Sequence, residues 1–170
     1  MPASLALAIA VLAMPAFGAE ESVEALQKRC DAKDWAACSD LGLRHEKGQG
    51  VPQDYTRAAS HYEAACNAGN AVACNNLGIL HNTGRGLPKD PAKSAALYLK
   101  ACNGGYGPSC SLLAGQYLTG DGIAKDATKS AAYYRIACDF GHANGCYMLG
   151  LLHEDGTGVT KDDAKVVSNF

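Results

Sequence analysis

Cysteines are the residues of this 170-residue chain whose type and spacing point most directly to chemistry. The eight cysteines form four pairs, eight residues apart within a pair, and each pair follows the previous one after 36 residues. Such thiols can form disulfides, bind a metal or catalyse redox reactions. Zinc sites favour a C-x2-4-C spacing, which C-x7-C does not match, and a redox site would not be copied four times. The pattern therefore predicts disulfides and no metal.

The repeat also indicates which cysteines pair. Eight cysteines allow 105 connectivities, but only one local pairing is the same in every unit. Two packed antiparallel helices, 8–10 Å apart, bring inward-facing Cα atoms to roughly the 5–6 Å that a disulfide needs. We therefore expect four bridges: Cys30–Cys38, Cys66–Cys74, Cys102–Cys110 and Cys138–Cys146.

A loop of pattern G-x-G-[VLI]-x-x-D recurs at the same 36-residue step, at residues 48–54, 84–90, 120–126 and 156–162. Its first glycine suits the end of a helix, where φ must be positive. Its aspartate suits the N-cap of the next helix, and Pro91, directly after Asp90, suits the first helical position. Each loop therefore predicts one helix ending and another beginning.

The residues after each aspartate predict an amphipathic first helix. In one unit Ala58, Ala59, Tyr62, Ala65 and Cys66 fall on one face at offsets of 3 and 4. A second helix begins near residue 70 and carries a leucine followed by a small residue, which lets a neighbouring helix approach closely. The sequence thus predicts an all-α solenoid of helix hairpins, with units at about 22–50, 51–86, 87–122 and 123–158 and a partial unit at 159–170.

The two ends of the chain depart from the repeat. Residues 5–14 are almost wholly apolar, and small residues at Ala16 and Gly18 fit a signal-peptide cleavage site. We expect residues 1–18 to be a signal peptide and residues 19–170 to be the exported solenoid; the alternative is an apolar first helix. Phe170 occupies the aromatic position of a further first helix, so we expect the array to continue beyond it.

Export agrees with the cysteine count, because disulfides persist in oxidising compartments. We therefore expect a secreted or periplasmic protein. The formal net charge of −2 gives no electrostatic case for binding nucleic acid or an anionic membrane surface. After signal removal we expect no stable membrane insertion, and we expect a monomer.

The pattern L-G-x-x-[HY]-x-x-G-x-G-[VLI]-x-x-D-x-x-K-[AS]-A-x-x-[YF]-x-x-A-C, from about residue 22 onward, resembles the Sel-one-like repeat, which is related to the tetratricopeptide repeat. The cysteines make it similar to the cysteine-rich Helicobacter subgroup. The resemblance implies a right-handed α/α superhelix with one disulfide per hairpin, export, and a protein-interaction or adaptor role. It also implies an alternative, because some members are catalogued as penicillin-binding proteins or weak β-lactamases.

The residues do not support that alternative. None of the serine β-lactamase motifs S-x-x-K, S-D-N and K-T-G occurs in the chain. His45, His81 and His153 share one repeat position, but units stacked about 10 Å apart give poor geometry for a shared ion. A histidine there suits the C-terminal end of a helix dipole or a packing role. We therefore predict no catalytic residue, no metal and no cofactor.

Binding residues are sought where the repeats differ. Two positions that flank the core stripe of the first helices vary from unit to unit. By analogy with related solenoids, these helices line the concave surface, where a protein or peptide would bind. The same positions would equally serve packing between adjacent units. The candidate residues are His61, Leu97 and Tyr133 at one position, and Glu63, Leu99 and Arg135 at the other.

Overall fold

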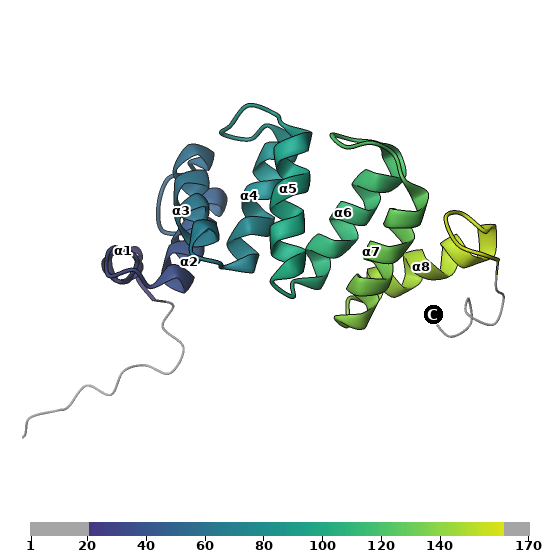
Figure 1. Ribbon diagram of the computed structural model, residues 1–170. Helices are drawn as coiled ribbons and strands as arrows, with labels where there is room; N and C mark the ends of the chain where they lie inside the picture. Colours follow the sequence, from purple (N-terminus) through teal and green to yellow (C-terminus); the bar gives the residue numbers. More distant parts are fainter. Residues whose placement is uncertain (1–20, 162–170) are drawn as a thin grey trace, which may run out of the picture.

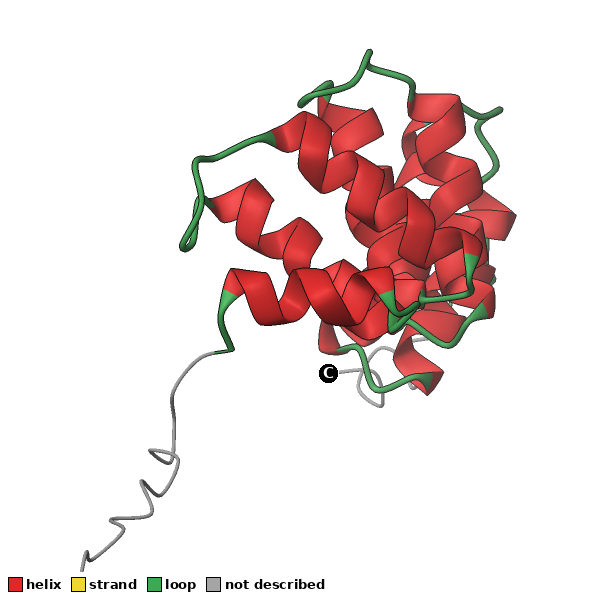
Figure 2. Ribbon diagram, turned by 90° about the vertical axis from the view of Figure 1, so that its left-hand side faces the viewer, coloured by secondary structure: helices red, strands yellow, loops and turns green. Residues whose placement is uncertain are grey.

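A computed structural model describes residues 21–161 of the chain, which form eight α-helices and, within that range, no strand. Figure 1 shows the helices in one row that follows the sequence from α1 to α8, and Figure 2 shows the loops between them. The expected signal peptide and the partial C-terminal unit fall outside or largely outside the described residues. The helices are α1 (Val23–Asp31), α2 (Trp35–Lys47), α3 (Tyr55–Asn67), α4 (Ala71–Thr83), α5 (Pro91–Asn103), α6 (Gly107–Thr119), α7 (Ala127–Asp139) and α8 (Ala143–Asp155).

The repeated loop ends one helix and begins the next, as its residues predict. The carboxylate of Asp54 accepts a hydrogen bond from the backbone N–H of Arg57 at 2.9 Å, and so caps α3. Asp90 and Asp126 cap α5 and α7 in the same way. Gly48 ends α2 with a φ of 69°, a conformation that glycine adopts without steric cost.

The loop also folds back onto its own helix and onto the preceding unit. The backbone N–H of Asp90 donates to the carbonyl of His81, near the end of α4, at 2.8 Å. Gly86 lies so close to the start of α3 that a Cβ there would come within 2.5 Å of the backbone of Tyr55. The hydroxyl of Thr56 donates to the carbonyl of Gly86 at 3.2 Å. These contacts set how successive units stack.

Two kinds of helix–helix interface alternate along the row. In the first kind, a tyrosine ring lies over a glycine of the preceding helix, and a Cβ on Gly42 would be only 2.7 Å from the ring of Tyr62. Such glycine contacts bring α2 close to α3 and α4 close to α5. The predicted core stripe of α3 is buried in this packing: Ala58, Ala59, Tyr62, Ala65 and Cys66.

The second kind of interface is joined by disulfides between α1 and α2, α3 and α4, α5 and α6, and α7 and α8. The bridges join the pairs that the cysteine spacing predicts: Cys30–Cys38, Cys66–Cys74, Cys102–Cys110 and Cys138–Cys146. The Cα atoms of Cys66 and Cys74 are 4.6 Å apart, closer than the expected 5–6 Å but within the usual range for disulfides. No described residue is a free cysteine.

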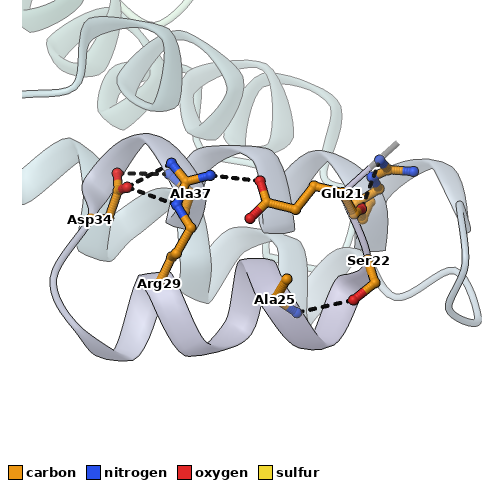
Figure 3. A network of polar contacts seen from close by, with 7 residues as sticks. Glu21, Ser22, Ala25, Arg29, Asp34 and Ala37 are labelled. Carbon is orange, nitrogen blue, oxygen red and sulfur yellow. Dashed lines mark hydrogen bonds and ion pairs between the residues drawn. The ribbon is translucent and has the colours of Figure 1, made fainter. Parts of the chain in front are cut away.

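The N-terminal end of the row is held by polar contacts (Figure 3). Ser22 caps α1 by accepting from the N–H of Ala25 at 3.2 Å. The guanidinium of Arg29 contacts the carboxylates of Asp34 and Glu21, each at 2.6 Å. Arg29 thereby joins Asp34, the N-cap of α2, to Glu21, which lies two residues before α1. No helix within residues 21–161 is long and apolar enough to cross a membrane.

Candidate functional site

The first set of predicted binding residues lies in a packed interface. His61 of α3 stacks on His45 of α2, with ring centroids 5.4 Å apart and ring planes 9° from parallel. Tyr133 of α7 stacks in the same way on Tyr117 of α6, at 5.5 Å and 4°. Leu97, the third member, is half-buried against the core. At this position the residues mainly join neighbouring helices.

The second set is open to solvent. Glu63, Leu99 and Arg135 are all exposed, and 37% of the surface of Leu99 is accessible. Of the three, only Leu99 presents a large apolar side chain. This position therefore stays a candidate contact surface, in which successive repeats present the acidic Glu63, the apolar Leu99 and the basic Arg135.

A cleft of about 400 Å³ lies on the second helices of the hairpins, α4, α6 and α8. Binding residues were sought in the sequence only on the first helices. The walls of the cleft come from α4, α6 and the start of α8, and Tyr134 of α7 also lines it. The lining residues include no Asp, Glu, Lys or Arg. They are Asn75, Ile79, Pro108, Ser111, Leu112, Gly115, Tyr134, His142 and Asn144.

Exposed apolar side chains gather on the same helices. Leu112 is 40% exposed at the cleft itself. Val72 and Tyr147 are 42% and 49% exposed, and they occupy the repeat positions of the cleft residues Pro108 and Ser111. We call this surface, formed by Val72, Ile79, Leu112 and Tyr147 together with the cleft, the even-helix face.

Polar side chains connect neighbouring helices beneath this face. The hydroxyl of Ser109 on α6 donates to the buried carboxamide oxygen of Asn75 on α4, at 2.7 Å. The carboxamide of Asn144 on α8 donates to the hydroxyl of Ser111 on α6, at 3.3 Å. Because these side chains are held by one another, the polar groups of the cleft have fixed positions.

The repeated histidines are buried between helices. His45, His81 and His153 are 6%, 5% and 2% exposed, and the Nδ1 atom of His153 lies 3.1 Å from the carbonyl oxygen of Thr160. Burial lowers the pKa of His81, and burial with the nearby His45 lowers the pKa of His61. Residues 21–161 contain no cluster of three or more histidine, cysteine or acidic side chains that could hold a metal ion.

A family model described as the Sel1 repeat matches residues 35–70, 71–106, 107–142 and 143–165. The chain belongs to the Sel1 repeat family. The matched Sel1 repeats begin at α2, α4, α6 and α8. They are therefore offset by one helix from the hairpin units predicted from the sequence. In this phase each close-packed glycine–tyrosine pair lies within one repeat, and each disulfide lies at a junction before or between repeats.

Solved structures place the chain among Sel1 proteins. A protective antigen of uropathogenic Escherichia coli strains with an SLR fold is 27% identical, with a TM-score of 0.85, covering 88% of this chain and 32% of the antigen. A Sel1 repeat protein from Oxalobacter formigenes is 27% identical, with a TM-score of 0.79, covering 85% of this chain and 59% of that one. The chain therefore spans less than two thirds of either protein.

The Helicobacter pylori cysteine rich protein B is also similar, as the cysteine ladder implies. It is 30% identical to this chain, with a TM-score of 0.55, over 72% of this chain and 87% of that one. No curated protein matches the chain. Sel1 repeat proteins are typically protein-interaction modules, so the family supports a binding role without naming the partner.

Sequence reasoning missed the cleft because it looked for variable positions only on the first helices of the hairpins. One signal was present. Three units carry glycine followed by leucine or isoleucine, namely Gly42-Leu43, Gly78-Ile79 and Gly150-Leu151, whereas α6 carries Ala114-Gly115. The exchange removes a large side chain from α6, and Gly115 lines the cleft.

Proposed function

We propose that this protein is an exported, non-enzymatic binding module that holds a segment of a protein or peptide on the even-helix face. The observation that carries the proposal is the cleft with exposed apolar side chains beside it and no Asp, Glu, Lys or Arg in its lining. Apolar side chains around a few positioned polar groups are typical of sites that bury part of a ligand. An extended peptide or a partner helix is the kind of occupant that solenoid grooves take.

The arrangement of the helices supports the choice of this face. Side-chain hydrogen bonds join α4 directly to α6 and α6 directly to α8. In a curved array, like helices of successive units approach most closely on the inner side. We therefore place α4, α6 and α8, rather than α3, α5 and α7, along the concave surface.

The disulfides support export. Four bridges persist only where thiols are kept oxidised, such as the periplasm or the extracellular space. The residue pattern at 1–18 is consistent with a cleaved signal peptide. No observation on residues 21–161 favours a β-lactamase or penicillin-binding activity.

The test is selection of binders from a random peptide library displayed on phage, with the oxidised protein as bait. Enriched peptides are synthesised, and their affinities are measured by fluorescence polarisation. Two leucines of similar exposure provide a matched pair of variants: Leu112→Asp on the even-helix face and Leu99→Asp on α5. We expect Leu112→Asp to weaken binding at least tenfold, because it places a charge against the apolar part of the ligand.

Leu99→Asp should leave the affinity within about twofold. If Leu99→Asp abolishes binding and Leu112→Asp does not, the surface predicted from the sequence is the correct one and the proposed face is wrong. If no peptide is enriched over protein with reduced and alkylated cysteines, the peptide-binding function itself is refuted.

A further inference from the structure

Tyr134 differs from Tyr62, its equivalent in the first repeat, because its surroundings differ at three repeat positions. In the first Sel1 repeat, the ring of Tyr62 lies over Gly42, where a Cβ would be only 2.7 Å away. The equivalent of Gly42 on α6 is Ala114, which is fully buried and does carry a Cβ. The ring of Tyr134 therefore cannot take the place that Tyr62 takes.

The second difference opens a space beside the ring. Gly115 stands where the other units carry Leu43, Ile79 and Leu151. A Cβ on Gly115 would lie 3.6 Å from the hydroxyl oxygen of Tyr134, so this hydroxyl is the nearest side-chain atom to the vacant position. A leucine or isoleucine at 115 would extend over the hydroxyl and fill this part of the cleft.

The third difference removes the partner of the hydroxyl. The hydroxyl of Tyr62 donates a hydrogen bond to the carboxylate of Glu46 at 2.7 Å. The residue equivalent to Glu46 on α6 is Leu118, which has no acceptor. Within residues 21–161 the hydroxyl of Tyr134 makes no hydrogen bond, although the residue is only 4% exposed and lines the cleft. This hydroxyl is not one of the fully buried polar atoms left without a partner, so it is accessible from the cleft, where a ligand oxygen can replace water as the acceptor of its hydrogen bond.

The lining of the cleft restricts the ligand's chemistry. Ile79, Leu112 and Pro108 offer apolar surface, while Tyr134 and Ser111 offer hydroxyl groups. Apart from His142, the lining has no acidic or basic side chain to pair with an ionised group, so a charged side chain would lose hydration with little compensation. An apolar side chain loses nothing there, and a carbonyl oxygen can accept from a hydroxyl.

We propose that this cleft is an anchor pocket for one uncharged, apolar side chain of a bound peptide, whose main-chain carbonyl oxygen accepts a hydrogen bond from the Tyr134 hydroxyl. The inference rests on the proposed function and deepens it, because it names the residue class that this module selects. It also accounts for Ala114, Gly115 and Leu118, the three residues at which this repeat departs from the first repeat around the tyrosine hydroxyl.

The experiment uses three small probes with blocked ends: the N-acetyl amides of phenylalanine, aspartate and glycine. Binding to the oxidised, ¹⁵N-labelled protein is followed by chemical-shift changes of backbone amides. We expect the phenylalanine amide to shift the amides of Leu112 and Gly115 in a saturable way. The aspartate and glycine amides should bind at least tenfold more weakly, because one is charged and the other lacks the apolar side chain.

Two variants test the pocket itself. Gly115→Leu introduces the side chain found in other repeats, so it should fold normally and abolish binding of the phenylalanine amide. Tyr134→Phe removes only the hydroxyl and should weaken binding by about five- to tenfold, the usual effect of one hydrogen bond. Ile136→Asp on α7, at an exposed residue outside the cleft lining, is the control and should change nothing. Circular dichroism and thermal unfolding of each variant show whether it is folded.

The outcomes separate this inference from the proposed function. If library-selected peptides bind and lose affinity with Leu112→Asp but not with Gly115→Leu, the module binds peptides and the anchor pocket is refuted. Equal binding of the aspartate and phenylalanine amides, or undiminished binding to Tyr134→Phe, also overturns it. If a folded Gly115→Leu variant loses both the selected peptides and the phenylalanine amide, the anchor pocket is supported.

Discussion

At the scale of single residues, the stacked rings of His45 and His61 make one interface sensitive to protonation. The rings lie 5.4 Å apart in the interface between α2 and α3. Burial, and then repulsion from His45, lower the pKa of His61 in the folded protein, whereas Asp31 acts in the opposite direction and Arg57 in the same one. Burial also lowers the pKa of His81. Both groups therefore favour the neutral form when folded.

The sign of the pH effect follows from these shifts. As the pH falls through the unfolded-state value of about 6.5, the unfolded chain takes up protons more readily than the folded one, so stability is lost. The free energy of unfolding should thus be lower at pH 5.0 than at pH 7.5. The double variant His45→Tyr/His61→Tyr copies the Tyr117–Tyr133 pair of another repeat and should lose less stability over this range.

Urea unfolding followed by circular dichroism at the two pH values measures this difference. The variant keeps His81, so part of the pH dependence should remain. An equal loss in the variant and the natural protein would mean that the stacked histidines do not contribute.

At the scale of the helices, glycine position decides how closely two elements pack. A Cβ on Gly78 of α4 would lie 2.7 Å from the ring of Tyr98 on α5, closer than real Cβ contacts occur. A Cβ on Gly115 of α6 would meet only the Tyr134 hydroxyl, at an ordinary 3.6 Å. The same substitution therefore has opposite expected effects at two glycines in the middle of helices.

We expect Gly78→Ala to lower the free energy of unfolding by about 1–2 kcal/mol, because overpacking costs more than the gain in helix propensity. Gly115→Ala should raise it by up to about 1 kcal/mol, since only the propensity gain applies. Chemical denaturation of both variants measures the two effects. A Gly78→Ala variant as stable as Gly115→Ala would show that the ring of Tyr98 moves aside without cost. The next repeat naturally carries an alanine, Ala114, at the position of Gly78, opposite Tyr134.

At the scale of the whole molecule, the disulfides hold the row of Sel1 repeats together. Each bridge joins cysteines eight residues apart, and a loop of that size stabilises the fold by about 2–3 kcal/mol in the chain-entropy model. The bridges differ in their protection from solvent. Cys66 and Cys74 are each 1% exposed, whereas Cys138 and Cys146 are both half-buried.

Limiting reductant should therefore open Cys138–Cys146 before Cys66–Cys74. Trapping of free thiols by alkylation, followed by peptide mass analysis over time, measures the order. Protein unfolded in urea is the control and should lose all four bridges at similar rates. The same order in folded and unfolded protein would show that burial does not set the reactivity of the bridges.

The repeat was accessible from the sequence because its causes are local. Asp54 caps a helix through the N–H group three residues later, and Gly48 ends a helix through its own φ angle. The pairing of Cys66 with Cys74 needs only one hairpin. Helix bounds, caps, core stripe and disulfides therefore follow from residues that are near one another in the chain.

The candidate site depends on contacts between residues far apart in the chain, and only the tertiary structure decided it. His61 and Tyr133 looked available, but each stacks on a ring of the preceding helix. The cleft was not foreseen, because the direction of the Tyr134 hydroxyl depends on Ala114, Gly115 and Leu118 of another helix. A repeated sequence determines the shared scaffold, whereas a surface that binds arises where side chains from several repeats meet in space.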